Sequence, residues 1–298
     1  MRWLAPAKIN LHLRVGKRRN DGFHPLCSWL VTVGLFDRLV IKREEASGFS
    51  FRCSDASIPS DERNLVVRAA RTFAAAAAVA PEQLGYSVTL LKSIPHGGGL
   101  GGGSSDAATV LVALNSLLGL GWAEDALANV GAAIGSDVPF FFSAPSAVLT
   151  GRGETVKPLA PPRAKWAVLV LPPMQVSTAD CYRQFDAMGL GDDQAVQNEP
   201  DFAQWAALSA PDLSARLVND LESPAFALQP NLAVLREKIE ADTKHIVRMS
   251  GSGSSLFALA DEAPEAAEIA ATVQRNCGIH AIAVQLAPQV RVDDTEPT

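Results

Sequence analysis

The segment with the clearest chemical potential runs from Gly97 to Gly103, where six of seven residues are glycine and two serines follow. Glycines let a backbone approach an anion closely, and the N–H groups and dipole of a following helix favour phosphate. Ser104 and Ser105 add hydroxyl donors or magnesium ligands, and Asp106 either acts on the metal side or caps the helix. The segment predicts a loop that binds a nucleotide triphosphate; the alternatives are a flexible linker and a tight helix-packing turn.

This loop differs from the two commonest nucleotide-binding templates. No lysine stands between its last glycine and the serines, as a Walker A loop requires. It also lacks the glycine spacing and the distant acidic partner of a dinucleotide-binding motif. The phosphate hypothesis therefore rests on the physics of the loop.

Two charged residues are candidates for phosphoryl transfer, which needs a group that orients the acceptor hydroxyl and a cation that balances charge. Asp137 lies among small and apolar residues in GSDVPFFF, and Lys8 lies beside Asn10 in an alternating segment. A lysine partner keeps an aspartate ionised and directs it toward a hydroxyl. The alternatives are a helix N-cap for Asp137 and a solvated strand residue for Lys8.

Other residues fit the recognition of a base or a phosphate. Phe23 offers a flat apolar surface and His24 a hydrogen-bonding group, although an ordinary turn packed on the core is equally consistent. A second small-residue turn surrounds Gly251 and Gly253, and it fits a hairpin better than a ligand loop. Lys92 either extends to solvent or approaches a nucleotide.

The elements that position these residues follow from hydrophobic periodicity. Residues 7–15 alternate, which predicts a strand with one buried face and a row of polar groups on the other. Residues 86–94 alternate again before the glycines, and Ser104 and Ser105 are expected to cap the amphipathic helix that follows. Strands are also expected at 29–33, 166–173 and 279–286 and on both sides of the glycine turn within 245–260, and helices at 64–80, 124–134 and 264–276.

This mixture predicts an α+β or α/β protein. Two lobes are expected because 298 residues exceed what one hydrophobic core usually organises. The proline-rich segment KPLAPPRAKW is expected to connect them. The predicted division is an N-terminal ATP-binding lobe at 1–157, a C-terminal substrate-side lobe at 158–288 and a frayed tail at 289–298.

Composition narrows the class of protein. The formal net charge of −6 argues against a surface that coats nucleic acid, and no apolar run approaches the length of a membrane span. Four cysteines lie far apart, and His12, His245 and His280 lack metal-ligand spacing, so they are interpreted as structural. Lys8 and Arg14 interrupt any signal-peptide core, and a cytoplasmic protein is expected.

Four ordered motifs, and a fifth segment at 219–226, resemble sequences of the GHMP kinase superfamily. PHGGGLGGGSSDAA at 95–108 is similar to its phosphate-binding motif, and GSDVPFFF and MSGSGSSLF are similar to its two further motifs. NDLESPAF at 219–226 is also typical of the family. APAKINLHLRVGKRRNDGFHPL at 5–26 resembles the N-terminal signature of the members that act on a cytidine-diphosphate-linked substrate. The resemblance spans roughly residues 5–260 and disfavours the mevalonate, homoserine and galactose kinases.

The resemblance implies both a reaction and a fold. Such a kinase would use ATP and magnesium to phosphorylate the 2-hydroxyl of 4-diphosphocytidyl-2-C-methyl-D-erythritol in the non-mevalonate isoprenoid pathway. The implied fold is α+β, with a ribosomal-protein-S5-like N-terminal lobe, a ferredoxin-like C-terminal lobe and the active site in the cleft. A monomer or weak homodimer is expected. The alternatives are another small-molecule kinase of the superfamily and a non-catalytic nucleotide-binding protein.

The resemblance also implies roles for residues. Asp137 matches the catalytic aspartate, Lys8 matches its partner, and no residue is assigned as a metal ligand. The residues matched to substrate binding are Asn10, Phe23, His24 and Tyr182. The residues matched to ATP binding are Asn64, Leu65 and Lys92 at the adenine and Pro95, Gly97, Gly98, Gly99, Leu100, Gly101, Gly102, Gly103, Ser104 and Ser105 at the phosphates. His24 is expected to read the cytosine, Phe23 replaces a tyrosine that is usual in the family, and His96 replaces an apolar residue.

Overall fold

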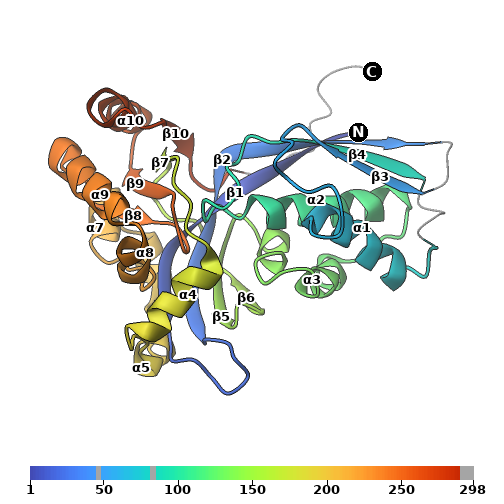
Figure 1. Cartoon of the computed structure of the whole chain (residues 1–298), viewed down its shortest axis with the longest axis horizontal. Helices are drawn as coiled ribbons and strands as arrows, with labels where there is room; N and C mark the ends of the chain where they lie inside the picture. The colour runs from blue at the N-terminus through green and yellow to red at the C-terminus, as the bar shows by residue number, and fades with distance from the viewer. Residues whose placement is uncertain (45–47, 81–84, 289–298) are drawn as a thin grey trace.

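The computed structural model describes residues 1–44, 48–80 and 85–288, and the predicted tail at 289–298 lies outside them. Its larger sheet is built around one long strand, β2 (Figure 1). The strands of this sheet are β1 (Arg2–Val15), β2 (Leu26–Arg43), β3 (Phe49–Cys53), β4 (Tyr86–Leu91), β5 (Ser146–Gly151) and β6 (Thr155–Pro158). β1 pairs antiparallel along one edge of β2, while β5 and β4 share the other edge. The strand predicted at 29–33 is therefore only a part of the first half of a longer one.

Helices cover one face of this sheet (Figure 1). They are α1 (Leu65–Ala76), α2 (Gly102–Leu117), α3 (Glu124–Ala132) and the short 3-10 helix η2 (Pro139–Phe142). The predicted cap of α2 is wrong: its N-cap is Gly101, in the left-handed region at φ 67°, and Ser104 and Ser105 lie inside the first turn. Because the glycine turns the chain into the helix earlier, the serine hydroxyls are not used as caps.

The second sheet has the order β10-β7-β9-β8, and its pairs are antiparallel. Its strands are β7 (Trp166–Val170), β8 (Val247–Met249), β9 (Leu256–Ala260) and β10 (Ala281–Gln285). The helices of this half are α4 (Thr178–Ala187), α5 (Asp193–Gln197), α6 (Phe202–Ala206), α7 (Ala210–Ser214), α8 (Glu222–Leu228), α9 (Pro230–Thr243) and α10 (Ala263–Cys277). The expected strands on both sides of the turn within 245–260 are confirmed as β8 and β9. Across the described ranges, no helix has the length and apolar character needed to cross a bilayer.

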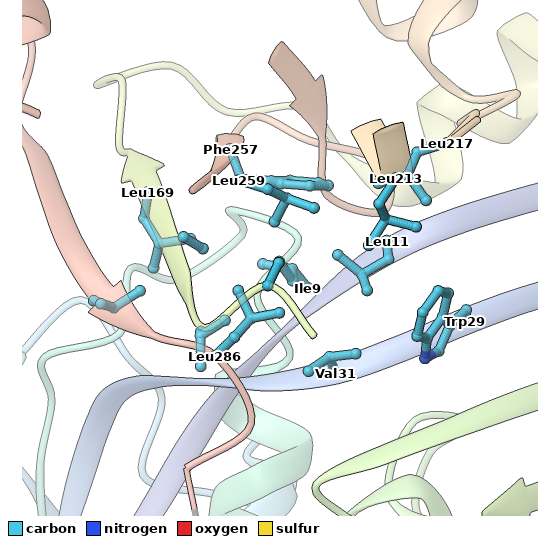
Figure 2. Close-up of a cluster of buried hydrophobic side chains, with 14 of the residues drawn as sticks. Ile9, Leu11, Trp29, Val31, Leu169, Leu213, Leu217, Phe257, Leu259 and Leu286 are labelled. Carbon is cyan, nitrogen blue, oxygen red and sulfur yellow. The ribbon is translucent and has the colours of Figure 1, made fainter. Parts of the chain in front are cut away.

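The two sheets are joined by an apolar cluster (Figure 2). Ile9 and Leu11 of β1 pack with Trp29 and Val31 of β2 against side chains of the second sheet. The side chains that they meet there include Leu169, Phe257 and Leu259. The apolar face predicted for 7–15 is thus buried between the sheets.

The polar face of β1 is buried as well. Lys8, Asn10 and His12 are only 4%, 7% and 2% exposed. The interpretation of Lys8 as a solvated strand residue is therefore wrong. Burying a charge and an amide is costly unless both are paired, so this row marks a place where polar partners converge.

Candidate active site

One cavity collects the predicted site residues. It has a volume of about 1240 Å³, and every residue proposed above for catalysis, ATP or substrate lines it, except Ser105. Ser105 is buried beneath the glycine loop, and its hydroxyl has no hydrogen-bond partner within the described part of the chain. Segments far apart in the sequence thus share one space large enough for two small-molecule substrates.

The glycine loop is held from two sides. The backbone N–H of Lys8 donates to the Leu100 carbonyl at 2.9 Å, which ties the loop to β1. On the other side, the Ser250 hydroxyl donates to the Gly99 carbonyl at 2.9 Å. Gly99 has φ +75°, and a Cβ there would lie 2.1 Å from the Ser250 carbonyl oxygen, so only glycine fits. The second glycine turn therefore supports the first.

Asn219 fixes this supporting turn. Its side-chain amide donates to the carbonyls of Met249 and Gly251, each at 2.8 Å, and its own oxygen accepts from the Leu221 N–H at 2.9 Å. All these bonds are shielded, because Asn219 is 5% exposed. The segment NDLESPAF thus acts on the glycine loop indirectly, through the turn.

Lys8 and Asp137 form an ion pair inside the cavity. Lys8 Nζ lies 3.3 Å from Asp137 Oδ2 and donates to Asn10 Oδ1 at 2.6 Å. The Asn10 amide in turn donates to the Ser28 hydroxyl at 2.9 Å. Asp137 is not a helix cap, because η2 is capped by Val138. The lysine is enclosed and the carboxylate is 37% exposed, so the carboxylate is open to an incoming hydroxyl.

An aromatic group lies at another part of the cavity. The imidazole of His24 is 5.0 Å from the ring of Tyr182, with 36° between their planes, and 5.7 Å from the ring of Phe185. His24 Nε2 lies 2.8 Å from Asp186 Oδ1. Asp186 was not predicted from the sequence, although its position four residues after Tyr182 on one helical face was a usable signal.

Phe23 adds an open aromatic surface to this group. Its ring is 54% exposed, so the interpretation as a turn aromatic packed on the core is wrong. The guanidinium of Arg152 lies over the ring, 4.8 Å from its centroid. Flat aromatic and guanidinium surfaces of this kind stack on bases.

Lys92 forms ion pairs with two buried carboxylates. Its ammonium bonds Asp37 and lies 3.2 Å from Asp106 Oδ2, and its side chain is 9% exposed, so the expectation that it extends to solvent is wrong. Burial acts to lower the pKa of Lys92, but the two carboxylates outweigh it and the pKa is raised. Burial also raises the pKa of Asp106, with Asp37 adding to the effect. This cluster ties the end of β4 to the start of α2.

Asn64 has a structural partner as well as a cavity position. Its side-chain oxygen accepts from the Val66 N–H at 2.9 Å, which caps α1, and its amide donates to the Pro59 carbonyl at 2.8 Å. Leu65 follows as the first residue of that helix. A nucleotide at this wall would meet groups that the helix end already holds in place.

Comparison with known proteins identifies the family. Sequence models of the GHMP kinases N terminal domain and of the GHMP kinases C terminal match residues 64–144 and 195–279. The 4-diphosphocytidyl-2-C-methyl-D-erythritol kinase of Shouchella clausii is 38% identical over 87% of this chain and 85% of its own. The chain belongs to the 4-diphosphocytidyl-2-C-methyl-D-erythritol kinase family. The kinase of the same name from Desulfotalea psychrophila is 39% identical over 85% of this chain and 83% of its own.

Solved structures agree with this assignment. A crystal structure of 4-(cytidine 5'-diphospho)-2C-methyl-D-erythritol kinase has a TM-score of 0.77 and 36% identity, covering 97% of this chain and all of its own. A homoserine kinase from Cytophaga hutchinsonii has a TM-score of 0.71 at 18% identity, which shows a common fold alone. The α+β GHMP kinase fold predicted from the motifs is confirmed, and members of the family are ATP-dependent phosphotransferases.

Proposed function

We propose that this kinase transfers the γ-phosphoryl group of ATP to the 2-hydroxyl of 4-diphosphocytidyl-2-C-methyl-D-erythritol, a step toward isoprenoid precursors. The observation that carries the proposal is the ion pair between buried Lys8 and partly exposed Asp137, which shares one cavity with the glycine loop and with the aromatic group around His24. In this proposal the phosphate donor binds at the glycine loop, and the base of the acceptor binds at the aromatic group.

Asp137 orients the acceptor hydroxyl. Its carboxylate accepts a hydrogen bond from the hydroxyl and takes the proton as the new O–P bond forms and the bond from the γ-phosphorus to the oxygen of the leaving ADP breaks. Lys8, held by Asn10, pairs with this carboxylate and places a positive charge beside the transferring group. Little covalent chemistry is required of the protein beyond this positioning.

The glycine loop binds the phosphates of ATP. Its N–H groups precede α2, where the helix dipole favours negative charge. Asn64 and Leu65 contact the adenine side, and Lys92 acts mainly by holding the start of α2. The residues proposed at the phosphates remain those of the loop, from Pro95 to Ser105.

Magnesium belongs to the proposal, and the donors present fit it. Within the described ranges, no three His, Cys, Asp or Glu side chains form a metal cluster. Mg²⁺ in kinases is carried largely by phosphate oxygens and water, with one or two protein ligands. Ser104 and Asp106 line the cavity, and Asp106 Oδ1 is buried without a hydrogen-bond partner in the described part of the chain. These two residues would hold the ion, which when bound neutralises charge on the phosphates.

The cytidine end of the substrate binds at the aromatic group. His24 hydrogen-bonds the cytosine, Phe23 and Tyr182 offer the apolar faces, and Asn10 contacts the sugar alcohol near Lys8. Phe23 keeps the stacking surface of an aromatic residue and lacks a hydroxyl. A cytoplasmic location, a monomer or weak homodimer and a lobe division at residue 157 also stay predictions.

An ADP-release assay with ATP and magnesium tests the proposal. It offers 4-diphosphocytidyl-2-C-methyl-D-erythritol beside mevalonate, homoserine and galactose, and release is expected with the cytidyl substrate alone. ADP release with a different acceptor instead would show that the proposed substrate is wrong.

The variant Asp137→Asn tests the residue roles. Turnover is expected to fall by about 10²–10⁴-fold, because the general base is lost, while ATP still binds. Asp125→Asn, an exposed carboxylate on α3, is the matched control and should leave turnover unchanged. Full turnover in Asp137→Asn would show that another group orients the hydroxyl.

A further inference from the structure

One face of α4 holds the His24 ring. Tyr182, Phe185 and Asp186 lie at helical spacing i, i+3 and i+4, and all three contact the imidazole. Tyr182 lies tilted against the ring, Phe185 meets it in an edge-to-face arrangement, and Asp186 engages one nitrogen. The side chain of His24 is 7% exposed in this setting, so the ring has one held orientation.

The partner of Nε2 decides where the proton of a neutral ring lies. Asp186 Oδ1 is 2.8 Å from His24 Nε2, and its other oxygen, Oδ2, lies 3.7 Å from Arg18 Nη1. An ionised carboxylate only accepts hydrogen bonds, and its second oxygen faces the Arg18 guanidinium. Nε2 therefore donates, and in a neutral imidazole Nδ1 is left as an acceptor.

Nδ1 is the atom left for a ligand. It has no hydrogen-bond partner in the described ranges, it is not among their buried unsatisfied atoms, and His24 lines the cavity. An acceptor at this place matches a ligand that presents an N–H donor. Cytosine presents an exocyclic amine at its 4-position, whereas uracil presents a carbonyl oxygen there.

We propose that Asp186 is a specificity-determining positioning residue, which fixes the His24 tautomer so that the site accepts a cytosine amine and rejects a uracil carbonyl. The inference rests on the proposed function, because it requires that the acceptor substrate carries a pyrimidine nucleotide. A uracil oxygen would face the Nδ1 lone pair, and the protein group and the ligand group would both lose a hydrogen bond.

Nitrogen-15 spectra of histidine-labelled protein test the tautomer without any need for activity. The His24 signals are assigned by their loss in His24→Gln. At pH 7.5 the wild type is expected to show a protonated Nε2 and an unprotonated Nδ1, and Asp186→Ala to lose this single state. A protonated Nδ1 in the wild type, whether as the other tautomer or as a doubly protonated ring, would overturn the proposal.

Kinetics test the consequence. The wild type is expected to prefer the cytidine diphosphate substrate over its uridine analogue by at least about 100-fold in kcat/KM. In Asp186→Ala and Asp186→Asn this ratio should fall about tenfold or more, through KM, with kcat for the cytidine substrate nearly unchanged. Thermal melting and ATP binding check that both variants fold.

Asp180→Asn is the matched control. It removes one carboxylate from the same helix, where Asp180 pairs with Arg183 and does not contact His24, and it should keep the wild-type ratio. An unchanged ratio in Asp186→Ala would overturn the inference and leave the proposed function standing. No ADP release with either nucleotide substrate would overturn the proposed function, and the spectra would still report the tautomer.

Discussion

The two ends of the cavity are built in different ways. The proposed phosphate end comes from one continuous segment, 95–104, whose backbone lines the cavity and in which Gly98, Gly99, Gly101 and Gly102 have neighbours too close for a Cβ. The aromatic end comes from side chains of the loop at 16–25, from Arg152 and from α4. A backbone site is fixed by the fold around it, whereas a side-chain site is assembled by packing between distant segments.

Because of this difference, substitutions at the two ends of the cavity are expected to have different effects. The supports of the phosphate end, Lys92 and the turn at Ser250, are buried and lie within the folded core. Substitutions there should lower both the stability of the fold and the affinity for ATP. The aromatic end is partly open, so changes there should alter the KM for the acceptor with little effect on folding. The predictions below test this division.

Lys92→Met should have the largest effect on stability. It leaves Asp37 and Asp106 buried without their cation, which is expected to lower the free energy of unfolding by about 3–5 kcal/mol. Urea unfolding measures the loss. The exposed Lys157→Met is the control. If Lys92 served only to bind adenine, stability would be unchanged and the KM for ATP alone would rise. Adding Asp106→Asn should restore part of the stability.

A substitution at His12 tests the buried polar face of β1, away from both ends of the cavity. Burial, reinforced by Arg14 and Arg248, lowers the pKa of His12 to about 4, and its ring packs on Phe202 and Trp205. The unfolded chain therefore binds a proton at a higher pH than the folded chain. Stability from this group is complete above pH 6.5 and falls by about 3 kcal/mol as the pH drops to 4.

The variant His12→Asn isolates this term from the other acid-sensitive groups. Its free energy of unfolding should depend less on pH between 6.5 and 4 than that of the wild type, as urea titrations at several pH values would show. His280→Asn, an exposed histidine, should keep the wild-type slope. Equal slopes for His12→Asn and wild type would mean that the buried ring takes up its proton at an ordinary pH.

Gly99→Ala tests the backbone design of the phosphate end. The added methyl would meet the Ser250 carbonyl at 2.1 Å, and φ is +75°, so the loop must move. A loss of ATP affinity of about 100-fold is expected, with a lower melting temperature, measured by titration calorimetry and thermal melting. Gly119→Ala, where φ is +64° but a Cβ meets nothing within 4 Å, controls for backbone strain alone. Equal effects of the two changes would contradict a role for the contact with Ser250.

The same difference explains what the sequence could predict. Alternation at 7–15 and the glycine segment are local patterns, so the strand, the loop and the following helix could be predicted from them. The burial of Lys8 could not, because the groups that surround its side chain, at Gly101, Asp137 and Gly251, come from residues more than 90 positions away. Arg152 was missed for a related reason, because it becomes informative only when folding places it over Phe23, whereas the helical spacing of Asp186 from Tyr182 was a local signal.

Phe23→Ala should have the smallest effect of this set, confined to the aromatic end. The ring is 54% exposed and packs on Arg152, so its removal leaves no cavity in the core. Loss of one stacking surface should raise the KM for the cytidyl substrate about tenfold, and kcat, the KM for ATP and the melting temperature should stay near wild type. Phe23→Tyr keeps the surface and should stay near wild type in all four quantities. A fall in kcat or in stability for Phe23→Ala would show that the aromatic end is coupled to the folded core as the phosphate end is, and the division between the two would fail.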